Sequence, residues 1–357
     1  MTNEASDFSG TGPVRRGQEL PEQRLLDWLE TNLPELEGSL RIEQFKGGQS
    51  NPTYKLITAT KSYVLRRKPA GILLRGAHAV DREYRVTRAL FDVGFPVPRP
   101  VALCMDEAVV GSSFFIMEFV DGRIFWNSTL PGLSIHERPH YFDALNANLA
   151  HLHSLNPAQM GLADFGRPEN YLQRQIARWS RQYVEDEQAG RNSDMDRLVE
   201  WLPAHAPPGD ECRVVHGDYR ADNVIFDARK VCVSAVLDWE LSTLGHPIVD
   251  FTYHLMMYHL PPKVIGGVAG TDLRAMGIPD EEQYIRDYCR RTGRAGIESL
   301  DFYLAFNLFR FAAILHGIRG RLVRGTASSS HARTVAANVE LVASIAWGKA
   351  LHGSSVI

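Results

Sequence analysis

The residues best suited to chemistry lie in one short stretch, where an aspartate follows a strand-like run and an asparagine comes five residues later. Asp218 ends a His-Gly-Asp turn, Asn223 opens the next apolar run, and Asp238 ends the run after that. A carboxylate in such a loop can orient a hydroxyl group and accept its proton. A carboxamide and a second carboxylate are oxygen ligands of the kind that Mg²⁺ prefers. The three residues therefore fit phosphoryl transfer, which depends on positioning and charge compensation.

Strands are needed to deliver these side chains. Residues 213–216, 223–226 and 231–237 are short β-prone runs, which predict a small sheet. On either side, in 168–202 and 281–350, apolar residues recur with helical spacing. We therefore expect a single β insertion within a mostly helical region.

The N-terminal part has the opposite character. Short β-prone runs separated by turn residues predict an antiparallel meander within 35–120, preceded by a short helix over 23–33. One further helix is predicted by apolar side chains at spacings of four, three and four, from Val80 to Phe91. The chain thus predicts a two-lobed α+β fold. We expect a disordered tail over 1–20, an N-terminal lobe over 21–120 and a C-terminal lobe over 121–357.

Composition excludes several classes of function. The chain has 357 residues with a net charge of -3, so charge gives no signal for nucleic acid or an acidic membrane surface. No run approaches the roughly 18 apolar residues of a membrane span, and the N-terminus has no secretory signal. The four cysteines form no CxxC pair, which favours free thiols in a reducing compartment. We expect a cytoplasmic protein that binds neither nucleic acid nor membrane.

The motifs resemble those of the aminoglycoside phosphotransferase family, a branch of the protein-kinase-like superfamily. HGDxxxxN over 216–223, followed by a strand and LDWE over 237–240, matches that family's hallmark. The resemblance runs from about residue 35 to 350. It implies a protein-kinase-like two-lobed fold with ATP and Mg²⁺ as cofactors. It also implies that Asp218 is catalytic and that Asn223 and Asp238 bind the metal.

Other segments resemble the nucleotide site of that family. The segment 46–51 looks like the phosphate-covering hairpin, 64–66 like the strand with the phosphate-binding cation, and 81–84 like the helix with its glutamate partner. The segment 117–122 looks like the hinge of that family, where the carbonyl of Glu118 and the amide of Val120 would hold adenine. The implied nucleotide-binding residues are Gly47, Gly48, Ser50, Asn51, Arg66, Glu83, Glu118 and Val120.

Two features depart from the family pattern. The usual cation is Lys, whereas the aligned residue here is Arg66, and Lys68 is the alternative after a shift of two residues. Arg binds phosphate through a planar fork and does not replace Lys in detail. The hairpin also lacks a complete GxGxxG.

Elsewhere we expect structural roles for His216 and for Asp250, the latter as an acceptor of hydrogen bonds from loop amides.

The C-terminal region gives a signal about the acceptor. Residues 302–339 contain no Asp or Glu but several arginines, which favours an anionic acceptor unless they form a solvated face. The candidate acceptor-binding residues are Arg310, Arg319, Arg321 and Arg324.

A closer resemblance concerns segments 63–69, 77–84 and 237–245, which look like the kinase domain fused to certain acyl-CoA dehydrogenases. That resemblance implies phosphorylation of a small-molecule hydroxyl, on a hydroxyacyl-CoA. No dehydrogenase domain lies in this sequence, so we expect an acyl-CoA dehydrogenase partner to be a separate protein. Two alternatives stay open: a kinase of aminoglycosides or other amino-alcohols, and a nucleotide-binding pseudokinase, for which Arg66 is the argument.

Overall fold

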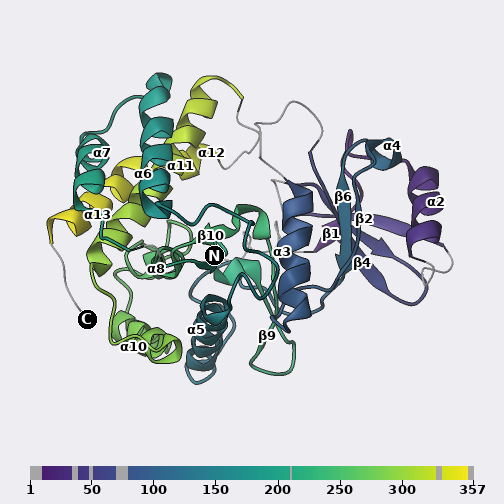
Figure 1. Ribbon diagram of the computed structural model, residues 1–357, viewed down its shortest axis with the longest axis horizontal. Helices are drawn as coiled ribbons and strands as arrows, with labels where there is room; N and C mark the ends of the chain where they lie inside the picture. The colour runs from purple at the N-terminus through teal and green to yellow at the C-terminus, as the bar shows by residue number, and fades with distance from the viewer. Residues whose placement is uncertain are drawn as a thin grey trace. The chain divides into compact units, whose positions relative to one another are not determined.

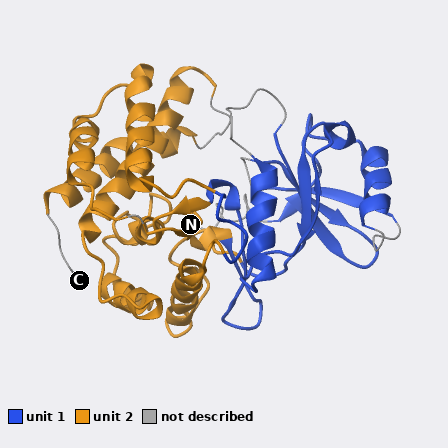
Figure 2. Ribbon diagram, viewed as in Figure 1, with its two compact units in different colours: residues 1–123, 159–165, 224–242 blue, residues 124–158, 166–223, 243–357 orange. Residues whose placement is uncertain are grey.

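The structure is a computed structural model in which two compact units are distinguished (Figure 2). Unit 1 comprises residues 1–123, 159–165 and 224–242, and unit 2 comprises residues 124–158, 166–223 and 243–357. The residues that the structure describes are 10–33, 39–47, 51–69, 79–209, 211–326 and 332–352.

Unit 1 is built on a six-stranded antiparallel sheet with the order β1-β2-β3-β4-β6-β5 (Figure 1). Neighbouring strands pair antiparallel throughout, and β3 alternates in the expected way: Tyr54 and Leu56 are buried and Lys55 between them is partly exposed. This confirms the predicted antiparallel arrangement. The strands are β1 (Thr11–Gly12), β2 (Arg41–Phe45), β3 (Thr53–Ile57), β4 (Ser62–Arg67), β5 (Pro100–Cys104) and β6 (Phe114–Glu118).

Three helices accompany this sheet. The predicted helices are present as α2 (Glu22–Asn32) and α3 (Val80–Asp92), and a single turn, α4 (Glu107–Val110), adds a third. From α2, Leu25 and Leu29 enter a core shared with the sheet. The buried face of α3 includes one charged side chain, Glu83, among apolar ones. A charged group in that position needs a partner, and the site described below provides one.

Part of the predicted tail is joined to the sheet. Thr11 pairs with Phe45 across β1 and β2, and the hydroxyl of Tyr54 donates to the carbonyl of Gln18 at 2.7 Å. These contacts use backbone groups, which hydropathy does not reveal. Residues 10–20 are therefore attached to unit 1, while residues 1–9 lie outside the described part of the chain.

Unit 1 also contains a hairpin from much later in the sequence, β8 (Val224–Phe226) and β9 (Val233–Val236). Arg123 and Phe226 exchange both backbone hydrogen bonds, at 2.8 and 2.9 Å. The amide of Val236 donates to the carbonyl of Pro96 at 2.8 Å. Three backbone hydrogen bonds thus attach the hairpin to the first 123 residues.

Unit 2 is mostly helical, as predicted, with one two-stranded sheet of β7 (Arg213–Val215) and β10 (Thr243–Gly245). Its centre is α11, a 24-residue helix that is apolar almost all round and packs against α6, α7, α8 and α13 (Figure 1). The helices are α5 (Arg138–Ser154), α6 (Tyr171–Glu185), α7 (Ser193–His205), α8 (Pro247–Leu255), α9 (Leu273–Met276), α10 (Glu281–Thr292), α11 (Leu300–Val323), α12 (Ala332–Ala336) and α13 (Val339–Leu351).

The structure also describes the four cysteines and the helices among which a membrane span would be found. All four cysteines are free thiols, as the sequence predicts. Within the described ranges, no helix combines the length and the apolar character that crossing a bilayer requires.

The close approach of Gly122 to the hairpin provides a test of the unit 1 packing. A Cβ atom on Gly122 would lie 2.3 Å from the carbonyl oxygen of Phe226, so G122A must displace backbone. We expect G122A to lower the free energy of unfolding by about 1–3 kcal/mol, the usual range for overpacking. Urea unfolding followed by circular dichroism measures this loss.

Gly348, inside α13, is the matched control because a Cβ there would meet no atom within 4 Å. We expect G348A to be stabilising by about 0.5–1 kcal/mol, since alanine is the better helix former. Equal unfolding midpoints for G122A and the wild type would contradict the packing described here.

Candidate active site

The catalytic loop predicted from the sequence lies in unit 2 and begins where β7 ends. The chain turns at Gly217, whose φ of 85° lies in the left-handed region that favours glycine. The amide of Asp218 donates to Nδ1 of His216 at 3.2 Å, which closes the turn. His216 is fully buried, in agreement with its predicted structural role.

Asp250 of α8 holds this turn in place. Its carboxylate accepts hydrogen bonds from the amides of His216 at 2.7 Å and Gly217 at 2.8 Å, as predicted. A third contact joins it to Nε2 of His153 at 3.2 Å. Burial raises the pKa of Asp250, but these donors outweigh it and the pKa ends below its usual range. The carboxylate is therefore a charged anchor for the loop.

Asn223 fixes the backbone and the carboxylate of Asp218. Its Nδ2 donates to the carbonyl oxygen of Asp218 at 2.9 Å and to Oδ2 at 3.2 Å. The other carboxylate oxygen of Asp218, Oδ1, is buried and accepts no hydrogen bond of normal length from the described residues, and the Tyr253 hydroxyl is a further donor near this carboxylate. The loop thus supplies no donor to one aspartate oxygen, and the carboxamide oxygen of Asn223 is not used in this pair.

Arg310 of α11 supports the same turn from another side. Its Nη2 donates to the carbonyl of Gly217 at 2.8 Å, and its guanidinium lies over the rings of Tyr253 and Trp179. Arg310 is only 7% exposed. We predicted it as an acceptor-binding residue, whereas its position suits a residue that positions the catalytic loop.

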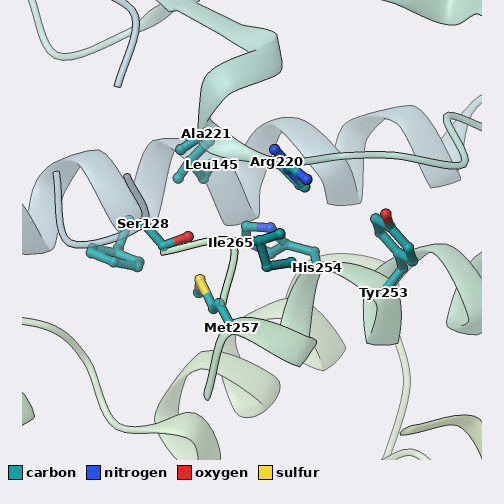
Figure 3. A pocket seen from close by; sticks show the side chains of 9 residues that line it. Ser128, Leu145, Arg220, Ala221, Tyr253, His254, Met257 and Ile265 are labelled. Carbon is teal, nitrogen blue, oxygen red and sulfur yellow. The ribbon is translucent and has the colours of Figure 1, made fainter. Parts of the chain in front are cut away.

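A small cavity lies beside this loop, under Arg220 and Ala221 (Figure 3). Its volume of about 20 Å³ suits one or two water molecules. Arg220 pairs with the carboxylate of Asp222, with Nε 2.9 Å from Oδ1. Burial together with the negative charge of Asp218 raises the pKa of the Tyr253 hydroxyl, which therefore stays protonated.

The second group of predicted residues lies in unit 1 and centres on Arg66 of β4. Its Nε donates to Oε2 of Glu83 at 2.8 Å, so the expected pair of cation and glutamate is present. Its Nη2 contacts Oδ1 of Asp238 and lies 3.5 Å from Oε2 of Glu240. Nδ2 of Asn51 donates to that same Glu240 oxygen at 3.1 Å. Arg66, and not Lys68, is therefore the cation in the glutamate pair.

The electrostatics of this cluster follow from its composition. One guanidinium faces three carboxylates, two of them, on Asp238 and Glu240, partly exposed. Burial raises the pKa of Glu83, and the negative charges of Asp238 and Glu240 raise it further against the effect of Arg66. The three carboxylates raise the pKa of Arg66 despite its burial. The cluster therefore couples one buried cation to three acidic side chains.

The sequence argument did not assign a role to Glu240, although it is part of the quoted LDWE motif. The signal that could have identified it is its spacing, two residues after Asp238. Between them the chain enters a short 3₁₀ turn, Trp239–Leu241, after a left-handed residue at Asp238 with a φ of 63°. This turn directs both carboxylates to Arg66.

The structure describes the predicted adenine-binding residues and part of the predicted phosphate-covering hairpin. Glu118 ends β6, and its side chain accepts from Nη2 of Arg99 at 2.8 Å. The amide of Val120 has no hydrogen-bond partner within the described ranges, so it is available to a ligand. Gly47 lies two residues after the end of β2 at Phe45. Gly48 and Ser50, which we predicted in the phosphate hairpin, lie outside the described residues.

The other predicted acceptor arginines differ in their surroundings. Arg319 binds both carboxylate oxygens of Glu340 at 2.7 Å, and Arg324 binds those of Asp186 at 2.6 and 3.0 Å. Arg321 is exposed. The partners of Arg319 and Arg324 lie outside 302–339, so the absence of acids from that stretch does not leave these two arginines unpaired.

Asp218 and Asn223 thus lie together in unit 2, and Asp238 lies with Arg66 in unit 1. The convergence of all three on one ion stays a prediction. Among the described residues, no group of three or more His, Cys, Asp or Glu side chains forms a metal cluster. Mg²⁺ does not need such a cluster, because it takes one or two protein ligands and completes its shell with phosphate and water.

Comparison with known proteins agrees with these motifs. The sequence model of the phosphotransferase enzyme family (APH) matches residues 41–303. Acyl-CoA dehydrogenase family member 10 of Mus musculus is 40% identical over 340 residues, which are 94% of this chain and 32% of the mouse protein. The chain therefore spans about a third of the length of that relative.

Two solved structures show the same fold. One, a candidate aminoglycoside phosphotransferase from Ralstonia eutropha JMP134, has 45% identity and a TM-score of 0.85, covering 94% of this chain and all of the other. The other, spectinomycin phosphotransferase with ADP and spectinomycin, has a TM-score of 0.60 at 15% identity, covering 92% and 98%. The chain belongs to the phosphotransferase enzyme family and has the α+β fold of these structures.

Proposed function

We propose that the protein transfers the γ-phosphoryl group of ATP, with Mg²⁺, to a hydroxyl of a hydroxyacyl-CoA. The observation that carries the proposal is the geometry of Asp218. Asn223 holds one of its carboxylate oxygens, and the other accepts no hydrogen bond of normal length from the described residues. A hydroxyl can donate to this oxygen. Asp218 would orient the acceptor hydroxyl and take its proton.

Asn223 and Asp238 would hold the metal. Nδ2 of Asn223 is engaged by Asp218, which leaves its carboxamide oxygen as a ligand. The Asp238 side chain is 32% exposed and so is open to an ion. Both are oxygen donors of the hard type that suits Mg²⁺, which would compensate charge on the transferred phosphate. The residues present therefore fit the metal.

Arg66 would contact the phosphates from unit 1, with Glu83 fixing its side chain. The carbonyl of Glu118 and the amide of Val120 would bind adenine. On this proposal, residues 21–120 form the nucleotide lobe, with 121–357 supplying the catalytic loop and the acceptor site. The nucleotide complex of spectinomycin phosphotransferase supports a nucleotide donor for this fold.

A hydroxyacyl-CoA is the acceptor that the relatives support best. The chain matches about a third of a mouse protein that is named for acyl-CoA dehydrogenase, which suggests consecutive steps on one acyl group. A dehydrogenase would then use the product. An aminoglycoside acceptor is the second candidate, because the Ralstonia relative is described in those terms. A pseudokinase is the third, and the intact set of Asp218, Asn223 and Asp238 argues against it.

The proposed base can be tested by D218N. We expect kcat to fall by about 10²–10⁴-fold, because an amide cannot accept the hydroxyl proton. Steady-state kinetics with Mg·ATP measures this loss. D227N is the matched control, since Asp227 is partly exposed and caps a turn through the amides of Arg229 and Lys230. Wild-type turnover in D218N would show that Asp218 is not the general base.

Substitution of Arg66 tests the phosphate contact. We expect R66K to keep most of kcat while KM for ATP rises by about tenfold, because lysine keeps the charge but loses the fork. R66A should lose far more, because the buried carboxylate of Glu83 then loses its cation. R88A, at an exposed pair on α3, is the control. Unaltered KM and kcat in R66A would show that Arg66 does not bind phosphate.

The acceptor is identified by a phosphoryl-transfer screen with Mg·ATP. We expect transfer to hydroxyacyl-CoAs, none to aminoglycosides, and no product after EDTA removes Mg²⁺. Detection of the phosphorylated acceptor by mass spectrometry is the measurement, with D218N as the blank. Transfer to an aminoglycoside alone would replace the proposed acceptor. ATP binding without transfer to any acceptor would favour the pseudokinase.

A further inference from the structure

We propose that an arginine-lined groove between α6 and the end of α11 binds the phosphate groups of coenzyme A. The inference rests on the proposed acceptor and adds a place for its nucleotide half. The groove has a volume of about 430 Å³, which is in the range of small-molecule sites. It is lined by Arg178, Arg181, Gln182, Glu185, Asp186 and Arg324.

The free positive charge comes from α6. Arg178 and Arg181 are exposed, and neither has a carboxylate partner among the described residues. They are three residues apart on the helix and therefore neighbours on its surface. Arg321 approaches the groove from α11, because its Nη1 and Nε2 of Gln182 both lie within 4 Å of a Cβ built on Gly317. Guanidinium groups that face solvent in a hollow suit phosphate oxygens.

The fourth arginine is held in a fixed orientation. Arg324 donates Nη1 and Nη2 to the two carboxylate oxygens of Asp186, which leaves its other N–H groups for a ligand. This hydrogen bonding lowers the pKa of Asp186, so the pair stays charged. Asp186 fits against α11 only because position 320 is glycine: a Cβ there would lie 1.9 Å from Oδ2. The groove therefore has a rigid side as well as free cations.

The groove lies in the same unit as the catalytic loop and is connected to it through Arg310. That guanidinium is 5.6 Å from the ring centre of Trp179, and Nη2 binds the carbonyl of Gly217. Trp179 is next to Arg178 in the sequence. Asp186, at the C-terminal end of α6, lies about 10 Å from Trp179 along the helix axis, at 1.5 Å per residue. The long arm of coenzyme A separates its acyl group from its phosphates, so the two ends can occupy separate places.

The balance of charges favours a compact phosphate ester over an extended polyanion. Three arginines and two acids line the groove and Arg321 lies beside it, whereas the whole chain carries a net charge of -3. A net positive charge confined to a hollow binds a few phosphates. A nucleic acid or an acidic membrane needs a broader basic surface.

The test compares R178A/R181A with the control R286A/R290A, which removes two exposed arginines from α10 of the same unit. Calorimetry with coenzyme A, without ATP, measures binding independently of turnover. We expect Kd to rise about 10–100-fold in R178A/R181A, as charge-assisted hydrogen bonds are lost, and to stay unchanged in the control. Dephospho-coenzyme A, which lacks the 3′-phosphate, shows whether that phosphate or the diphosphate is bound.

Turnover separates this inference from the proposed function. A higher KM for a hydroxyacyl-CoA, with an unchanged KM for the pantetheine ester without nucleotide, supports the groove. Wild-type KM for the CoA ester in R178A/R181A overturns the groove and leaves the proposed function intact. If the wild type phosphorylates neither ester, the proposed acceptor is wrong. The coenzyme A titration alone then decides whether the groove binds coenzyme A. Binding of oligonucleotides or anionic vesicles, with none of coenzyme A, also overturns it.

Discussion

The catalytic loop depends on one buried carboxylate, that of Asp250, which replaces a strand partner for the turn after β7. Two successive amides point at it, and the next residue is Asp218. Left buried without that acceptor, each amide would cost about 1–3 kcal/mol. Because the pKa of Asp250 is lowered in the fold, its stabilising effect is present at neutral pH and is lost as the pH falls through the folded-state value. The loop geometry is therefore an electrostatic property of the core.

Arg66 is the counterpart of this anchor in unit 1. Its Nε donates to Glu83, and its Nη2 contacts Asp238 and lies 3.5 Å from Glu240. Burial and the two neighbouring carboxylates raise the pKa of Glu83. These contacts explain why Arg can stand where Lys is usual: its fork binds two carboxylates at once.

Local features of the fold and site were predictable from the sequence, and long-range ones were not. The helical and strand periodicities indicated the two unit types, and the HGDxxxxN and LDWE motifs pointed to Asp218, Asn223 and Asp238, whose shared role stays a prediction. Contacts between distant segments have no periodicity to reveal them, so the pairing of β1 with β2 and the attachment of the β8–β9 hairpin to Arg123 were missed. The arginines of α11 show the same limit, since Asp186 pairs with Arg324 across 138 positions.

Charge read along a sequence therefore differs from charge at a surface. Within the segment chosen for its arginines, Arg310 supports the catalytic turn, and Arg319 and Arg324 bind carboxylates. Exposed guanidinium groups also lie on α6, at Arg178 and Arg181, next to Arg321 of α11; in the sequence the neighbouring Glu185 and Asp186 mask this positive charge. Packing determines which arginines stay free. Because position 320 of α11 is glycine, Asp186 can pack against the helix, where it pairs with Arg324. What stays exposed on α6 is the charge that packing has not used, and a ligand with phosphate groups can bind there.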